Sequence, residues 1–121
     1  MGHICEVEHQ GKKILIQDFS NMRPGEEFRR GIAEARAYIA RQPPKSVLSV
    51  FDATQAFYDT EVLVALKDFT KHNEPYIKAS AVVGVTGVAS IAVMAVSRFS
   101  GRTFKIFDDR ASAMDWLVAQ P

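Results

Sequence analysis

The sequence predicts a single α/β domain, residues 1–121, with a mainly parallel sheet of about five strands, an antiparallel N-terminal hairpin strand and about four helices. Three observations carry this prediction. The 121 residues are the length of one domain. Two strand-like segments separated by a short turn open the chain, which indicates a hairpin. Short apolar segments then alternate with amphipathic segments of helical period, as in strand–helix units with parallel strands.

The first third of the chain supplies the hairpin and one helix. Residues 3–9 alternate between apolar and polar side chains, as in a half-buried strand in which Cys5 faces the core. A turn at 10–12 leads to a second strand at 13–19. Apolar residues spaced three and four apart predict a helix from 24 to about 41, which two prolines then end.

The rest of the chain alternates strands and helices. Near-continuous apolar runs are typical of strands that are covered on both faces. Asp59 or Thr60, and later Asp108 or Asp109, are residues that can cap the helix that follows them. The expected elements are a strand at 45–52, a helix at about 60–73, a strand at 79–85, an apolar helix at 88–99, a strand at 103–107 and a last helix that holds residues 111–118.

Composition limits the function classes. The chain has fifteen Lys and Arg and fourteen Asp and Glu, which gives a net charge of +1. The sequence therefore lacks the excess of basic residues that is typical of proteins that bind nucleic acid. The single cysteine cannot form an internal disulfide. No spacing of His, Cys or carboxylates suggests a metal site, and no nucleophile elbow is present, so we expect no cofactor and no enzymatic activity. No secretory signal is visible, and we expect a cytoplasmic protein.

One segment has the length of a membrane span. Residues 79–97 contain nineteen consecutive uncharged residues. Gly84 and Gly87 interrupt this run, so it is better explained as a strand, a turn and a helix in one core. We therefore expect no transmembrane segment.

Particular stretches of the second half carry a resemblance to a known family. They are 74–87 (EPYIKASAVVGVTG), 99–109 (FSGRTFKIFDD) and 113–117 (AMDWL). The order of elements is that of the STAS domain of bacterial anti-sigma-factor antagonists, and these stretches resemble the sporulation stage II AA-like family of small bacterial proteins. The resemblance implies a STAS-like fold and a non-enzymatic regulatory or protein-interaction role. The fold relation of this group to CRAL-TRIO lipid-transfer domains implies an alternative, a carrier or sensor of a lipid or other apolar small molecule.

The resemblance also points to a regulatory position. In anti-sigma-factor antagonists a partner kinase phosphorylates a serine in a pattern that resembles Asp-Ser-Ser-Gly, at the start of the helix after the third strand. Here Asp59 and Thr60 match the first two positions, Glu61 stands where the phosphorylated serine would be, and Val62 replaces the glycine. Glu61 either imitates a phosphate or favours the helix N-terminus. Thr60 and Thr54 remain candidate acceptors, with helix capping or a turn hydroxyl as the alternative.

The loop before this helix is the expected partner surface. Phe57 and Tyr58 either close one end of the core or anchor a partner. The loop follows a parallel strand, and open α/β sheets bind ligands at the carboxyl ends of their strands. Asp18, Asp52 and Asp59 could cluster there as well. The predicted partner or regulatory loop comprises Thr54, Phe57, Tyr58, Asp59, Thr60 and Glu61.

Two further segments are candidates for binding. Gly84, Thr86 and Gly87 lie between a strand and a helix, where free N–H groups can hold an anion, but a tight turn with close helix–sheet packing is the favoured explanation of the glycines. The helix at 88–99 is apolar on all sides, which favours burial in a homodimer interface, then a lid over an apolar ligand, then contact with a membrane surface. Its interface candidates are Val88, Ile91, Ala92, Met94 and Ala95.

Overall fold

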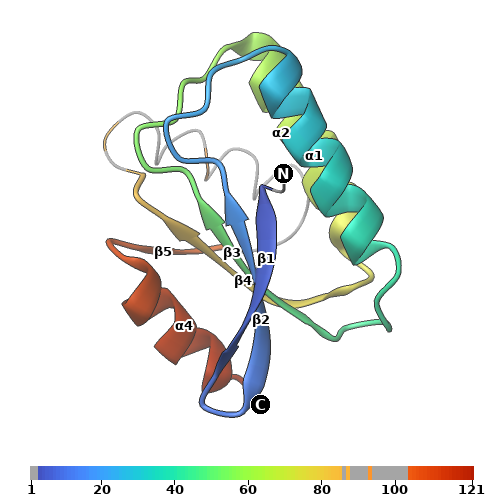
Figure 1. The fold of residues 1–121 in the computed structure, drawn as a ribbon, viewed down its shortest axis with the longest axis vertical. Coiled ribbons are helices and arrows are strands. Elements are labelled where there is room, and N and C mark those ends of the chain that lie inside the picture. The colour runs from blue at the N-terminus through green and yellow to red at the C-terminus, as the bar shows by residue number, and fades with distance from the viewer. Residues whose placement is uncertain (1–2, 86, 88–92, 94–103) are drawn as a thin grey trace.

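The computed structural model describes residues 3–85, 87, 93 and 104–121 as a five-stranded sheet with helices on both of its faces (Figure 1). In chain order the described elements are β1 (Ile4–His9), β2 (Lys12–Asp18), α1 (Glu26–Ile39), β3 (Val47–Asp52), α2 (Thr60–Asn73), β4 (Ile77–Val83), β5 (Lys105–Phe107) and α4 (Arg110–Val118).

The strands lie in the spatial order β1-β2-β3-β4-β5. β1 pairs with β2 in antiparallel fashion, and every other neighbouring pair is parallel. In the parallel register Asp18 lies opposite Asp52, which places the last residues of β2 and β3 side by side at one edge of the sheet. The predicted mixed sheet of five strands is confirmed.

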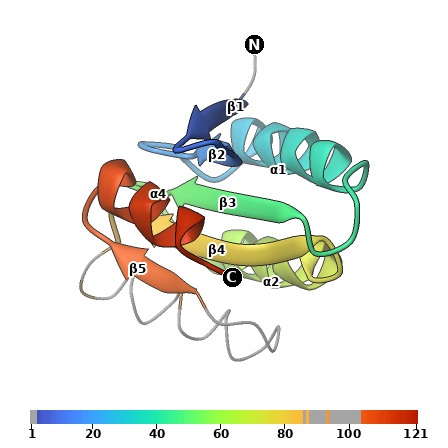
Figure 2. The same ribbon diagram turned by 90° about the horizontal axis from the view of Figure 1, so that it is seen from below.

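Two layers of helices cover the sheet. Figure 2 shows α1 and α2 on one face and α4 on the other. On the α4 face, Ala113 and Leu117 pack against alternate residues of the three central strands. On the opposite face, Ala35 and Ile39 of α1 and Phe69 of α2 pack against the residues in between. This division follows from the strand period of two, which sends successive side chains to opposite faces.

Side chains at the helix starts account for two of the helix boundaries. The Asp59 side chain accepts a hydrogen bond from the backbone N–H of Val62 at 2.8 Å, and the Asp109 side chain accepts one from Ser112 at 2.7 Å. Each carboxylate satisfies an N–H group that has no partner within its helix. Of the two alternatives predicted at each start, Asp59 and Asp109 are the caps.

Parts of the sequence prediction need correction. Cys5 was expected to face the core, but its side chain is exposed on the edge strand β1. The first helix begins at Glu26 rather than at 24, with Gly25 at its cap position. The described residues hold three helices, and the fourth predicted helix, 88–99, lies outside the described residues except for Val93.

Candidate functional site

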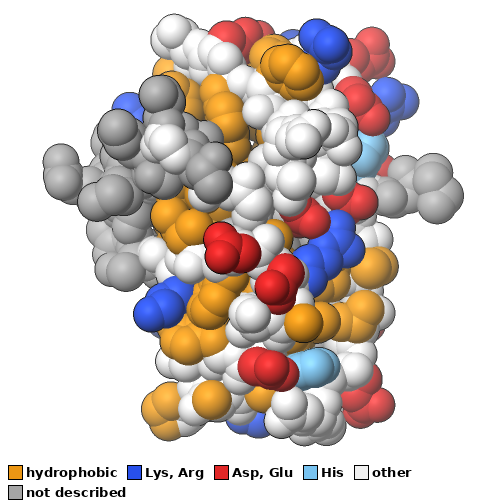
Figure 3. Space-filling model, turned by 90° about the vertical axis from the view of Figure 1, so that its left-hand side faces the viewer, with side chains coloured by type: hydrophobic (Ala, Val, Ile, Leu, Met, Phe, Trp, Pro, Cys, Tyr) orange, Lys and Arg blue, Asp and Glu red, His pale blue; other side chains and the backbone are white. Residues whose placement is uncertain are grey.

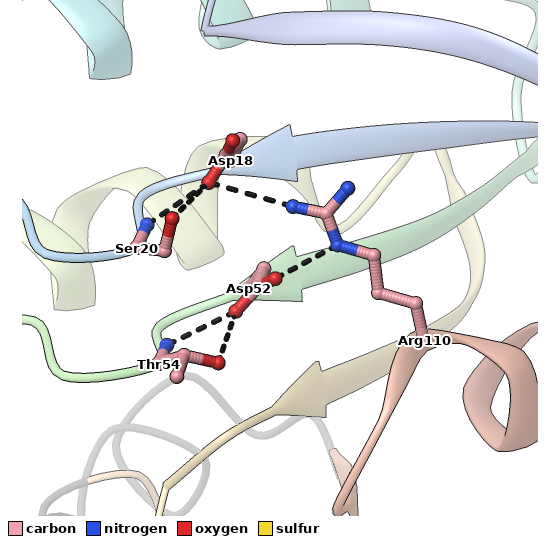
Figure 4. A network of polar contacts seen from close by, with 5 residues as sticks. All are labelled: Asp18, Ser20, Asp52, Thr54 and Arg110. Atoms are coloured by element: carbon pink, nitrogen blue, oxygen red, sulfur yellow. Dashed lines mark hydrogen bonds and ion pairs between the residues drawn. The ribbon is translucent and has the colours of Figure 1, made fainter.

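The carboxyl ends of β2 and β3 carry a charged cluster. Asp18 is the last residue of β2, and Asp52 is the last residue of β3. Arg110 is the first residue of α4, which covers the sheet face opposite to α1 and α2. Arg110 Nε donates to Asp52 Oδ2 at 2.8 Å, and its Nη2 lies 3.4 Å from Asp18 Oδ1 (Figure 4). One guanidinium therefore bridges both carboxylates and ties α4 to the loops that follow the two strands.

Each aspartate also orders the loop behind it. Asp18 Oδ1 accepts hydrogen bonds from the backbone N–H of Ser20 at 3.1 Å and from its hydroxyl at 2.6 Å. Asp52 Oδ1 accepts the same pair from Thr54, at 3.0 and 2.6 Å. The repeated Asp-x-Ser/Thr pattern thus builds two matching turns on neighbouring strands. We call these five residues, Asp18, Ser20, Asp52, Thr54 and Arg110, the aspartate–arginine cluster.

The two aspartates differ in their surroundings. The Asp52 side chain is 10% exposed, whereas the Asp18 side chain is 52% exposed. Burial acts to raise the pKa of Asp52, but the hydrogen bonds from Thr54 and Arg110 outweigh it and hold this pKa below its ordinary value of 3.8. Figure 3 views the left-hand side of Figure 1, on which α4 lies, and shows acidic and basic side chains next to one another between hydrophobic ones.

The charged groups of the aspartate–arginine cluster are already engaged in contacts within the protein. Arg110 already contacts two carboxylates, and the oxygens of Asp52 accept three hydrogen bonds within the protein. In the described ranges, no three His, Cys, Asp or Glu side chains come together as metal ligands. We therefore assign the cluster a structural role, which is to fix the positions of the adjacent loops.

The glycine turn after β4 lies against the same cluster. Gly84 has φ +84°, and a Cβ atom on it would lie 2.7 Å from the Cα atom of Thr54. Glycine is therefore required here both by conformation and by the close approach of two backbones. Gly87 also has positive φ, at +56°, and Thr86 lies outside the described residues. The close approach at Gly84 supports the tight-turn interpretation.

The two aromatic residues of the loop from 53 to 59 lie in different environments. Phe57 is 48% exposed, and the Arg23 guanidinium lies 4.4 Å from the centre of its ring. The Phe57 backbone N–H donates to the Met22 carbonyl at 2.9 Å, which holds this part of the loop in place. Tyr58 turns inward and packs against the core, and burial raises the pKa of its hydroxyl. Of the two aromatic residues, only Phe57 is thus presented to solvent.

The start of α2 also carries exposed side chains. Thr60 and Glu61 are exposed, and the Glu61 carboxylate lies 3.8 Å from Arg29 of α1. Val64, one turn further along, is 60% exposed. In the described part of the chain, Phe57 and Val64 are the exposed large hydrophobic residues. We call Phe57, Thr60, Glu61 and Val64 the loop–helix surface.

A cavity of about 60 Å³ lies between the sheet and α2. Its walls include the side chains of Phe51, Leu66 and Phe69, and its lining among the described residues contains no charged side chain. Gln17 of β2, which is 3% exposed, and Tyr58 also line it. We call this space the α2 cavity.

The structure brings together only part of what the sequence singled out. Asp18 and Asp52 meet as expected, but Asp59 instead caps α2. The predicted interface residues Val88, Ile91, Ala92, Met94 and Ala95 lie outside the described residues.

Arg110 and Gln17 were not predicted from the sequence. The repeated Asp-x-Ser/Thr pattern at two strand ends indicates the two turns, but not the arginine that contacts both carboxylates. Gln17 could have been noticed as a polar residue two positions after the apolar Leu15, and therefore on the same face of its strand.

The comparisons with known proteins concern the fold. No protein-family model matches the chain, and no curated protein matches it in sequence. The structure is similar to the crystal structure of an uncharacterized protein of the DUF3478 family with a SpoIIAA-like fold from Shewanella loihica PV-4. The two share 17% sequence identity with a TM-score of 0.73, over 94% of this chain and 91% of the other. The chain therefore has the SpoIIAA-like fold of STAS domains, as its sequence predicted.

The described residues contain no helix with the length and apolar character needed to cross a membrane.

Proposed function

We propose that the protein is a non-enzymatic regulatory module of the STAS type that binds a protein partner through the loop–helix surface. The fold supports this role, and the observation that carries it is the exposure of Phe57 on an ordered loop. An exposed aromatic side chain on a fixed backbone loses little conformational entropy when a partner covers it. Val64 adds a second apolar contact one turn along α2.

The surface also offers one accessible position for regulation. Thr60 is exposed at the first position of α2, where a phosphate would meet the positive end of the helix. The Thr54 hydroxyl instead donates to Asp52 at 2.6 Å and lies against the Gly84 turn. Phosphorylation at Thr54 would break the aspartate–arginine cluster, so we favour Thr60 as the acceptor.

The test compares affinity capture by three forms of the protein. The first is the unaltered chain, the second carries Phe57→Ser and Val64→Ser, and the third carries Glu8→Ser on the exposed edge strand β1 as a control. We expect the double variant to lose a partner that the control retains, while all three melt at similar temperatures. Retention of the same proteins by the double variant would show that the surface is assigned wrongly.

The alternative role as a lipid carrier stays a prediction. The α2 cavity, at about 60 Å³, is smaller than the cavity of about 150 Å³ that holds one benzene ring. This cavity alone does not hold a lipid chain.

A further inference from the structure

The α2 cavity contains polar atoms whose hydrogen-bonding capacity is unused. Gln17 is 97% buried, since its relative exposure is 3%. Within the described residues, its Oε1 atom and the Tyr58 hydroxyl oxygen are the buried side-chain atoms that have no hydrogen-bond partner. Both residues line the same cavity. Buried polar groups in native proteins are almost always paired, so two such atoms at one cavity indicate that something else satisfies them.

The remaining lining defines the chemistry of the occupant. Phe51, Phe69 and Phe104 contribute aromatic surface, and no Lys, Arg, Asp, Glu or His is among the described residues that line the cavity. An ionised ligand would be buried without a counter-charge, which is costly. The Ser49 and Ser80 hydroxyls, which also line the cavity, already bond to each other at 3.1 Å. Among the described residues that line the cavity, the buried side-chain atoms without a hydrogen-bond partner are Gln17 Oε1 and the Tyr58 hydroxyl oxygen.

We infer that the α2 cavity is a binding site for a small uncharged molecule that is largely apolar and carries a hydroxyl or N–H donor. The donor bonds to Gln17 Oε1, and the hydrocarbon part lies against the aromatic walls. The volume of about 60 Å³ accepts the polar end and a few carbon atoms, and the cavity is partly open, so the rest of the molecule extends through its opening. The site is separate from the loop–helix surface, because Phe57 and Val64 do not line it.

The sharpest test uses two probes of nearly the same shape, phenol and toluene, in which a hydroxyl group replaces a methyl group. A whole ring is larger than the cavity, so only the substituent and the nearest ring carbons of each probe enter it, and the rest of the ring lies in the opening. Each probe is titrated into ¹⁵N-labelled protein while NMR follows the side-chain amide signals of Gln17. We expect phenol to shift these signals in a saturable way and to bind about tenfold more tightly than toluene, the worth of one hydrogen bond to a buried acceptor.

Variants then test whether the preference for phenol over toluene depends on Gln17 Oε1 and the Tyr58 hydroxyl. Gln17→Met keeps the length of the side chain but removes the acceptor, and it should lower the affinity for phenol to that for toluene. Gln42→Met makes the same chemical change away from this cavity, where Gln42 Nε2 donates to the Tyr38 carbonyl, and it should leave the preference intact. If Gln17→Met does not fold, Tyr58→Phe removes the other polar atom and should reduce the preference.

Three results would overturn the proposal. They are equal affinities for phenol and toluene, binding of neither probe because the cavity holds water only, and an equal loss of preference in the Gln42→Met control. A cavity of this size has room for about four water molecules, at roughly 15 Å³ each. None of these results bears on partner capture by the loop–helix surface, so the two proposals fail independently.

Discussion

The aspartate–arginine cluster gives a prediction in which two similar residues should behave differently. Asp18→Asn and Asp52→Asn make the same chemical change at the ends of neighbouring strands, and each asparagine keeps an oxygen for the Ser20 or Thr54 turn. Asp52→Asn places an amide where the carboxylate oxygen now accepts from Arg110 at 2.8 Å. Asp18→Asn only weakens a contact of 3.4 Å to the same guanidinium.

The expected magnitudes follow from burial. A hydrogen bond between charged groups contributes about 1.5–3 kcal/mol, and the 38% exposure of Arg110 places the Asp52 pair toward the lower end. We expect Asp52→Asn to lower the free energy of unfolding by about 2 kcal/mol. The Asp18 side chain is 52% exposed, and surface ion pairs contribute about 0–1 kcal/mol, so Asp18→Asn should cost less than about 1 kcal/mol.

The pH dependence checks the same reasoning. The pKa of Asp52 is lower in the folded protein than its ordinary value of 3.8, so the ionised form is favoured by folding. Its contribution is therefore present above the unfolded-state pKa and is lost as the pH falls through the folded-state pKa. The difference between unaltered protein and Asp52→Asn should be constant above about pH 5 and should shrink below 3.8.

Urea denaturation followed by circular dichroism at several pH values measures all these quantities. An equal cost for Asp18→Asn and Asp52→Asn, or a change of less than about 0.5 kcal/mol for Asp52→Asn at pH 7, would contradict a structural role of the buried pair.

Three further predictions concern single features of the fold. Gly84→Ala should lower the free energy of unfolding by more than about 2 kcal/mol, because the added Cβ would meet the Thr54 backbone. Gly11→Ala, at a similar φ of +82° but in open space, should cost about 1 kcal/mol. Equal melting temperatures of the two variants would contradict this difference. Asp59→Ala should cost about 1 kcal/mol through loss of the α2 cap and Asp59→Asn far less, as denaturant titration can show. The apolar character of 88–99 predicts a homodimer, so native mass spectrometry should give twice the mass of the chain, and a monomer at micromolar concentration would contradict it.

Much of the fold could be predicted because each central strand or helix keeps one pattern of apolar residues over its whole length. The apolar run of β3 and the three- and four-residue spacing along α1 both reflect burial, which the structure confirms at Val50 and Ile39. The mixed sheet, with one antiparallel strand pair and parallel pairs otherwise, followed from the hairpin and the strand–helix repeats. Burial on the edge strand β1 was harder to predict. The alternation of apolar and polar residues shows which side chains share a face of the strand, but not whether another element covers that face. Val7 packs against the α4 side of the core, while Cys5, on the same face of β1, remains exposed.

The site could be predicted only where its residues are close in sequence. The Asp59 cap and the loop aromatics lie within a few positions of the helix they precede, so their placement was accessible. Arg110 meets Asp52 across 58 positions of chain, and nothing local in either segment indicates the other. The α2 cavity likewise depends on how far α2 stands from the sheet, which side-chain periodicity does not determine.

The most direct measurement of the central claim is photo-crosslinking inside cells from position 57. A photoreactive phenylalanine analogue replaces Phe57 in one form of the protein, and in a second form it replaces Glu8, which is exposed on β1. A regulatory module that binds through the loop–helix surface predicts a discrete crosslinked protein from position 57 and none from position 8. The absence of an adduct at position 57, or the same adducts from both positions, would contradict the account.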